Sequence, residues 1–279
     1  MKLYTTISSL QEALKAEQLK GLKIGFVPTM GALHEGHLSL VEQAGEISDI
    51  VVVSIFVNPT QFNDANDLVN YPRTIDADVN LLSTRRCDFV FCPSVDEIYP
   101  VPDTRKFDFG NLDKVMEGAF RPGHFNGVAQ VVSRLFEIVS PDMAFFGRKD
   151  FQQLAIIKDL VRQLKLQINI VSCDIVREAD GLAMSSRNKL LLPEYRECAP
   201  IIYRTLKTGR ELSITKSVAE VKEFVLNQIN STNLLKSEYF EIVDDTSLEA
   251  VQSWNDLGTK VGCIALYAGK VRLIDNLIF

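Results

Sequence analysis

The chain has few cysteines and lacks any arrangement of them that would build a disulfide framework or a zinc ribbon. Of its 279 residues, five are cysteines, at positions 87, 92, 173, 198 and 263. Five is an odd number, and no two of them form a C-x-x-C pair, so neither kind of framework is indicated. We expect buried thiols in a reducing compartment, which predicts a cytoplasmic protein.

Long apolar segments and an excess of basic residues are also missing. No apolar run approaches the roughly 20 residues that a membrane span needs, and the polar, helix-like segment 1–21 lacks the apolar core of a secretory signal. A net charge of -6 and a pI near 5.2 argue against a broad nucleic-acid surface, which normally needs clustered Lys and Arg. We therefore expect neither a membrane nor a nucleic acid as a partner, and a polyanion would have to be met by a few local groups.

Apolar, β-branched runs alternate with helical periodicity through the first two-thirds of the chain. The runs lie at 23–27, 49–57, 88–92, 143–147 and 168–176. Between the first two, Leu38, Val41 and Ala44 repeat at the spacing of one helical face, and segment 149–166 carries a stronger pattern of the same kind. This alternation predicts a doubly wound parallel sheet with its ligand site at the carboxyl ends of the strands.

The sequence pattern changes after residue 176. A polar loop is followed by two helical stretches, one strand-like stretch and two strands around a tight Ala-Gly-Lys turn, at 177–188, 193–212, 217–230, 238–245 and 261–279. We therefore predict an α/β protein with a Rossmann-like domain at 1–176 and a smaller α+β domain at 177–279.

The segment PTMGALHEGHLSL, residues 28–40, holds two of the three histidines, His34 and His37. Its G-x-x-x-x-G is not followed by the Lys and Ser or Thr of a phosphate-binding P-loop, and its histidines are three apart where the metalloprotease pattern needs four. A glycine-rich turn from strand to helix can instead present a helix N-terminus to an anion, with both imidazoles on one side. We favour a phosphate site over two purely structural histidines.

Several segments resemble those of a known family. H-x-G-H at 34–37 resembles the motif that nucleotidyltransferases and class I aminoacyl-tRNA synthetases place on ATP phosphates, and AMSSRN at 183–188 looks like their partner motif on a mobile loop. The chain also carries, in this order, the segments VPTMGALHEGH, SIFVNPTQF, YPRT, FFGRKDFQQL and READGLAMSSRN. With these segments it resembles the pantoate–β-alanine ligase family from about residue 24 to the C-terminus. The resemblance implies ATP-dependent condensation of pantoate with β-alanine through pantoyl adenylate, with release of pyrophosphate and AMP.

The resemblance also implies the site residues. It assigns the reacting phosphates to His34, His37, Lys149, Ser185, Ser186 and Arg187. It assigns the rest of the ATP site to Met30, Gly31, Ala32, Leu33, Glu35, Gly36, Gly147, Arg148, Asp150, Val176 and Met184. It assigns the substrates to Asn58, Gln61, Gln153 and Tyr71, with Arg73 and Arg121 as weaker candidates. Amide side chains suit pantoate because they can donate to a carboxylate and accept from a hydroxyl. We expect the third histidine, His124, to be structural.

Two positions depart from the family pattern. An acidic cluster that commonly holds magnesium after YPRT is reduced here to Asp76 and Asp78, with Ala77 between them. Asp78 remains the candidate ligand, through water, for the Mg²⁺ expected with ATP. Arg148 stands where a glutamate is usual, and it adds positive charge beside Lys149.

Other functions stay open at this point. An adenylyl- or cytidylyltransferase would use the same histidine motif but keep the nucleotide on its product. An aminoacyl-tRNA synthetase would need a tRNA-binding module, for which this acidic chain has no evident room. A non-catalytic regulator would bind ATP without acid-dependent release of AMP. Members of the ligase family are typically homodimers joined through the first domain, with the second domain as a lid, so the resemblance implies both features here.

Overall fold

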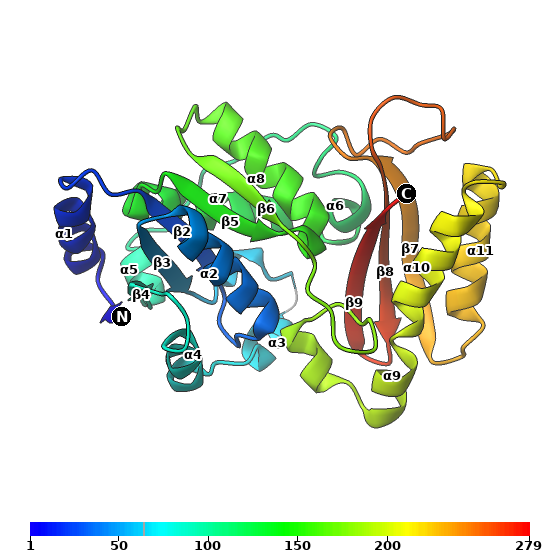
Figure 1. Cartoon of the computed structure of the whole chain (residues 1–279), viewed down its shortest axis with the longest axis horizontal. Coiled ribbons are helices and arrows are strands. Elements are labelled where there is room, and N and C mark those ends of the chain that lie inside the picture. The colour runs from blue at the N-terminus through cyan, green and yellow to red at the C-terminus, as the bar shows by residue number, and fades with distance from the viewer. Residues whose placement is uncertain (64) are drawn as a thin grey trace.

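A six-stranded parallel sheet carries the first two-thirds of the chain (Figure 1). The computed structural model describes residues 1–63 and 65–279. The strands are β1 (Lys2–Tyr4), β2 (Ile24–Thr29), β3 (Ile50–Ile55), β4 (Phe89–Phe91), β5 (Met143–Gly147) and β6 (Asn169–Cys173), in the spatial order β1-β4-β3-β2-β5-β6. The predicted doubly wound sheet is confirmed. The sequence did not predict β1, because three residues carry no periodicity and only pairing with β4 defines the strand.

Helices cover both faces of this sheet. They are α1 (Ile7–Gln18), α2 (Glu35–Ile47), α3 (Ala65–Asn70), α4 (Ile75–Leu82), α5 (Val95–Ile98), α6 (Met116–Phe120), α7 (His124–Val139) and α8 (Phe151–Gln163), with 3-10 turns η1 (Pro59–Gln61) and η2 (Arg148–Asp150). Successive strand residues point to opposite faces. Phe26 and Val52 pack in the cluster with α1, α7 and α8, whereas Val27 and Val53 pack with α2 and α4.

A three-stranded antiparallel sheet follows, in the order β7-β8-β9 (Figure 1). Its strands are β7 (Leu235–Asp244), β8 (Lys260–Ala268) and β9 (Val271–Ile278), preceded by η3 (Ser186–Leu190), α9 (Pro193–Cys198), α10 (Ile201–Leu212) and α11 (Val218–Asn230). One face of this sheet packs on α10 and α11 through residues such as Ile264, and the other packs through Cys263 on Met116. The single helix predicted at 193–212 is two helices, because Pro200 lacks the backbone N–H that a continuous helix needs there.

The order of the parallel strands opens a crevice between β2 and β5. The chain runs from β2 outward to β3 and β4, then returns to place β5 and β6 on the other side of β2. Ligands bind at such a reversal, beyond the carboxyl ends of the strands. The α2 helix and the turns η1 and η2 begin there, directly after β2, β3 and β5.

Two expectations from composition can be compared with the structure. The five cysteines are unpaired, with Cys87, Cys173 and Cys263 buried and Cys92 and Cys198 half-buried. Within the described ranges, no helix has both the length and the apolar character that a membrane crossing requires.

Candidate active site

A buried carboxylate holds the turn between β2 and α2. Gly31 and Ala32 adopt φ angles of 83° and 50°, in the left-handed region, and a Cβ on Gly31 would start 3.0 Å from the Asp78 carboxylate. Asp78, in α4, accepts the backbone N–H groups of Ala32 at 3.0 Å and Leu33 at 2.8 Å. The turn therefore faces Asp78 and delivers His34 to the start of α2.

The two imidazoles of the motif lie side by side, with ring centroids 4.1 Å apart. His34 is the N-cap of α2, and its Nδ1 accepts the N–H of Gly36 at 3.1 Å. Because Nδ1 is an acceptor, the hydrogen of the neutral His34 ring is on Nε2. Nδ1 of His37 is buried and has no hydrogen-bond partner among the described residues. An unpaired buried nitrogen of this kind marks a place where a ligand can supply the missing partner.

Both imidazoles are neutral near physiological pH. Burial, together with the positive charge of Lys149, lowers the pKa of His34 to about 4. Burial, the neighbouring His34 ring and Lys149 lower the pKa of His37 to about 3. The charge of Lys149 therefore acts on both rings, and each ring is available as an uncharged N–H donor.

The backbone at the start of α2 is less available to an anion than the sequence predicted. The N–H of Gly36 is bonded to the His34 ring, and the N–H of His37 is bonded to the His34 carbonyl at 2.8 Å. The expectation of free N–H groups is wrong for these two positions, because the N-cap histidine occupies both. Side chains are therefore the main donors at this strand end.

Lys149 comes from η2, at the carboxyl end of β5. Its side chain is only 20% exposed, and its Nζ lies 3.8 Å from the carboxylate of Asp150. The preceding residue, Arg148, forms a 2.6 Å ion pair with the exposed Asp174. Arg148 is thus paired outside the cavity, whereas Lys149 lines the same cavity as the imidazoles and its charge acts on both of them.

The serine-rich loop lies against the same turn. A Cβ on Gly36 would lie 3.6 Å from the Cβ of Met184, so these two segments touch. Met184 donates its N–H to the carbonyl of Val176 at 3.0 Å, and the Oγ of Ser185 accepts the N–H of Arg187 at 3.3 Å. These bonds shape the loop that lies against the start of α2.

A cavity of about 220 Å³ lies where these segments meet. The predicted residues that line it are Met30, His34, Gly36, His37, Asn58, Gln61, Tyr71, Gly147, Lys149, Asp150, Gln153, Val176, Met184, Ser185, Ser186 and Arg187. A larger cavity of about 570 Å³ shares Lys149, Asp150, Gln153, Ser185 and Arg187 with it, and is also lined by Arg121 and His124. The fold therefore gathers most of the predicted site from four separate parts of the sequence.

Other predicted residues line neither cavity. They are Gly31, Ala32, Leu33, Glu35, Arg73, Asp78 and Arg148. Glu35 is exposed and pairs with Arg85 at 3.2 Å. The guanidinium of Arg73 donates to the carbonyls of Leu68, Val69 and Tyr71 at the end of α3.

Asp78 does not fit its prediction as a metal ligand. Both of its oxygens accept backbone N–H groups, and the Thr74 hydroxyl adds a third donor at 3.2 Å. In the part of the chain that the structure describes, no group of three or more His, Cys, Asp or Glu side chains could hold a metal ion. The buried Asp78 carboxylate is therefore a structural part of the turn.

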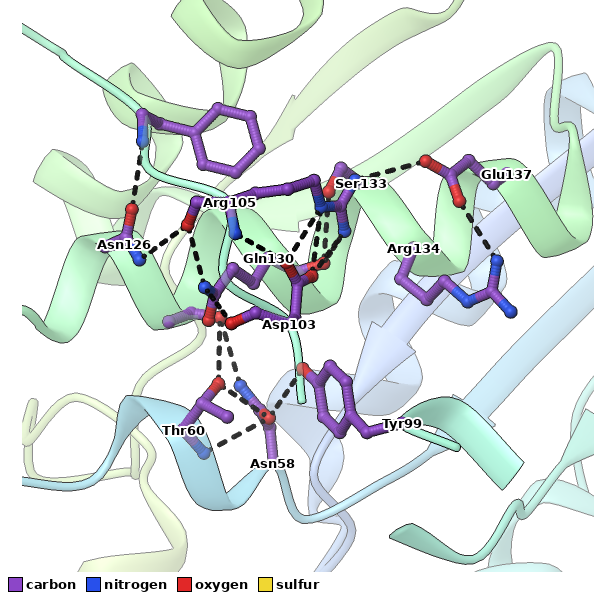
Figure 2. Close-up of polar contacts among 12 residues, drawn as sticks. Asn58, Thr60, Tyr99, Asp103, Arg105, Asn126, Gln130, Ser133, Arg134 and Glu137 are labelled. Atoms are coloured by element: carbon purple, nitrogen blue, oxygen red, sulfur yellow. Dashed lines mark hydrogen bonds and ion pairs between the residues drawn. The ribbon is translucent and has the colours of Figure 1, made fainter. Parts of the chain in front are cut away.

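Asn58 caps the turn η1, which carries Gln61, and Figure 2 shows Asn58 with its partners Thr60 and Tyr99. Its amide nitrogen donates to Gln61 Oε1 and to the Gly127 carbonyl, both at 3.1 Å. Its Oδ1 accepts from the Tyr99 hydroxyl at 3.0 Å and from the Thr60 hydroxyl at 3.1 Å. Since both ends of this buried amide have protein partners, Asn58 orients Gln61.

A polar network begins on the other side of Gln61. Nδ1 of His124 donates to the Gln61 carbonyl at 2.8 Å, because a carbonyl can only accept, and Nε2 accepts from Arg121 at 3.2 Å. Burial and the charge of Arg121 lower the pKa of His124 to about 4. Both ring nitrogens have protein partners, which agrees with a structural role for His124.

Glu117 in α6 joins this network to the C-terminal sheet, and the sequence analysis missed it. It accepts from Arg272 at 2.6 and 2.8 Å and from the Tyr239 hydroxyl at 2.9 Å, and lies 3.5 Å from Arg121. Burial opposes its ionised form, but Arg272 and Tyr239 hold the pKa of Glu117 below its ordinary value. No local pattern could have indicated this residue, because its main partners lie more than a hundred positions away.

The chain is similar to several known proteins. It matches the family model described as Pantoate-beta-alanine ligase over residues 2–278. It is 55% identical to the pantothenate synthetase of Bacteroides fragilis over 277 residues, which are 99% of this chain and 98% of that protein. It is 56% identical to the pantothenate synthetase of Phocaeicola vulgatus over 278 residues, which are 99% of each.

Solved structures of the same family also match this chain. The crystal structure of pantothenate synthetase from Thermus thermophilus matches with a TM-score of 0.93 and 42% identity over 99% of each chain. The pantoate-β-alanine ligase of Francisella tularensis, crystallised in complex with β-γ ATP and β-alanine, matches with a TM-score of 0.84 and 37% identity over 100% of this chain and 97% of that one.

Proposed function

Because the chain belongs to the pantoate–β-alanine ligase family, we propose that it condenses pantoate with β-alanine, consumes ATP, and releases pyrophosphate and AMP through a pantoyl-adenylate intermediate. The observation that carries this proposal is the convergence of two neutral imidazoles, Lys149 and the serine-rich loop around one cavity. The Francisella relative, which binds β-γ ATP and β-alanine together, supports it.

The first step joins two anions. An oxygen of the pantoate carboxylate bonds to the α-phosphorus of ATP, and the bond from that phosphorus to the pyrophosphate oxygen breaks. Donors must neutralise the charge that builds on the transferred group while the reactants stay in line. We assign this work to His34, His37, Lys149, Ser185, Ser186 and Arg187, all of which line the smaller cavity. The low pKa of His37 favours an electrostatic role over proton donation.

The acid to be activated is selected by amides. Gln61 and Gln153 line the same cavity as the imidazoles, and Gln61 is held by Asn58 and through its own carbonyl by His124. An amide can donate to the pantoate carboxylate and accept from its hydroxyls. This placement favours a carboxylic acid substrate over the second substrate of a nucleotidyltransferase. Tyr71, buried at the same cavity, completes the proposed pantoate site.

The second step brings in the amine. The nitrogen of β-alanine bonds to the acyl carbon of the adenylate, the bond to AMP breaks, and the amine loses a proton. Gln153 and Lys149 line both cavities, so an amine that enters the larger cavity meets the adenylate at their junction. We assign the approach of β-alanine to the larger cavity for that reason.

Magnesium is proposed to accompany ATP, since it binds phosphate oxygens. The predicted protein ligand, Asp78, does not fit because its oxygens are occupied by the turn.

We also propose that residues 177–279 form a lid domain on residues 1–176, in a cytoplasmic homodimer. The C-terminal sheet, α10 and α11 share a hydrophobic cluster of their own, which supports a separate domain. The homodimer and the cytoplasmic location rest on resemblance to the family. Sedimentation equilibrium of the purified chain tests the dimer, and a mass of one chain at micromolar concentration would contradict it.

Quantifying pyrophosphate and AMP separately tests the activity. With ATP and pantoate alone, we expect about one pyrophosphate per active site and little free AMP, and β-alanine should then release AMP and start turnover. Lys149→Ala should suppress this release of pyrophosphate in the presence of ATP and pantoate. Lys158→Ala, on the exposed side of α8, should not suppress it. Pyrophosphate release that does not depend on pantoate would refute the proposal.

A further inference from the structure

Lys149 lies in a short turn that has no side-chain capping hydrogen bond of its own. The turn η2 is a single 3-10 turn between β5 and α8. Gly147, its N-cap, has no side chain that could cap it, and Asp150, the N-cap of α8, makes no side-chain capping hydrogen bond. A lysine ammonium sits on a flexible four-carbon stem, so its location depends on where the backbone is held.

Asn276 on β9 reaches the turn from the C-terminal sheet. Its Nδ2 donates to the carbonyl of Arg148 at 2.8 Å and to the carbonyl of Lys149 at 3.0 Å. Because both neighbours are carbonyl oxygens, the amide nitrogen and not the amide oxygen must face them. Asn276 is buried, so water competes little for these bonds.

Asn276 is held in place by its neighbour. Asp275 is buried, accepts the backbone N–H of Asn276 at 2.7 Å, and pairs with Arg177 at 2.6 and 2.9 Å. Arg177 begins the segment that leads to the loop 184–187. Adjacent residues of β9 therefore hold the two segments that flank the proposed phosphate site. Asp275 holds the segment that leads to the loop 184–187, and Asn276 holds the turn η2.

We propose that Asn276 is a positioning residue for adenylate formation. By holding the carbonyls of Arg148 and Lys149, it keeps the Lys149 ammonium directed toward the imidazoles of His34 and His37. The inference rests on the proposed function, in which Lys149 neutralises charge on the triphosphate. Asn276 lines the larger cavity but not the smaller one, so it acts on the phosphates through Lys149.

Two substitutions test the proposal in single-turnover experiments. Asn276→Ala removes both donors, and Asn276→Asp sets a carboxylate against two carbonyl oxygens. A displacement of about 1 Å at a reacting group can cost on the order of 10²-fold, so we expect pyrophosphate release with pantoate and ATP to slow by up to that factor, more in the aspartate variant. The reaction of supplied pantoyl adenylate with β-alanine should slow much less than adenylate formation, because only the first step needs Lys149 to neutralise charge on the triphosphate. Asn227→Asp, an exposed residue of α11, makes the same chemical change and should affect neither step.

A double-mutant cycle separates positioning from general damage. If Asn276 acts through Lys149, adding Asn276→Ala to Lys149→Ala should slow adenylate formation little further, whereas independent effects would multiply. Multiplying effects, a wild-type adenylation rate in Asn276→Ala, or a loss confined to the β-alanine step would overturn the proposal. Should the alanine variant fail to fold, Asn276→Ser, which retains one donor, takes its place in the cycle. A wild-type protein that releases no pyrophosphate in the presence of pantoate would instead refute the proposed function.

Discussion

Replacing His37 by glutamine and by alanine distinguishes an uncharged hydrogen-bond donor from an acid. Glutamine carries an N–H at about the reach of the imidazole Nε2 but does not titrate in this range, whereas alanine leaves no donor. His37 lies beside His34 in the smaller cavity, with its charged form opposed by burial and by Lys149. The glutamine variant should therefore retain part of the function that the alanine variant loses.

The magnitude follows from the pKa and from the value of a single donor. With a pKa of about 3, roughly one His37 ring in ten thousand is protonated near pH 7. An imidazolium is thus nearly absent from the free enzyme, and the neutral ring must be the active form. Loss of one preorganised donor costs about 10² to 10³ in rate, so we expect that loss of adenylate formation in His37→Ala and a smaller one in His37→Gln.

The assay is the pH dependence of kcat/KM for ATP, expressed as the ratio of wild type to His37→Gln. The ratio cancels the ionisation of ATP and pantoate, which both enzymes experience alike, and kcat/KM reports the free enzyme. We expect a flat ratio between about pH 5.5 and about pH 8. A ratio that rises tenfold for each unit of falling pH would mean that the protonated ring is the active form, and the electrostatic assignment would be wrong.

Three further predictions concern stability and the metal. The pKa of His124 falls from 6.5 in the unfolded chain to about 4 in the folded protein. Its contribution to the free energy of unfolding is therefore complete above pH 6.5 and is lost as the pH falls toward 4. Between pH 6.5 and pH 4, the free energy of unfolding of the wild type should fall by about 3 kcal/mol more than that of His124→Asn. In urea titrations, the difference in free energy of unfolding between the two proteins should therefore narrow on acidification, and a constant difference would contradict this. Asp78→Asn should lower the free energy of unfolding by about 1 to 3 kcal/mol without changing the Mg²⁺ concentration for half-maximal activity; a higher Mg²⁺ requirement would restore Asp78 as a ligand. Glu117→Ala should cost about 3 kcal/mol by urea unfolding, because two arginines lose a buried partner, while the exposed Glu137→Ala should cost at most about 1 kcal/mol; equal costs would count against the network.

The pattern of the sequence was sufficient for the core of the fold. The runs at 23–27, 49–57 and 143–147 became β2, β3 and β5, because consecutive β-branched and aromatic residues suit a strand covered on both faces. The pair of strands around Ala268-Gly269-Lys270 became β8 and β9 for a similar local reason. The H-x-G-H and serine-loop motifs were also legible, since each is short and continuous. Most of the residues predicted from them line one cavity.

Local patterns were a poorer guide to what each side chain does. Asp78 and Asn58 have the right chemistry for a ligand, but the fold places backbone and side-chain partners on every polar atom that would have served it. The sequence could not indicate these partners, because a motif specifies residue type and position in the chain, not the neighbours that occupy its hydrogen-bonding groups.

By itself, the sequence determined most of the strands and longer helices and made the H-x-G-H and serine-loop motifs legible, because these features depend on residues a few positions apart. Only the tertiary structure decided that Glu117 would meet Arg272 and that Asn276 would hold the turn of Lys149. Such pairs form when distant segments pack, and their stabilisation comes from burial that neither partner has in its own stretch of chain.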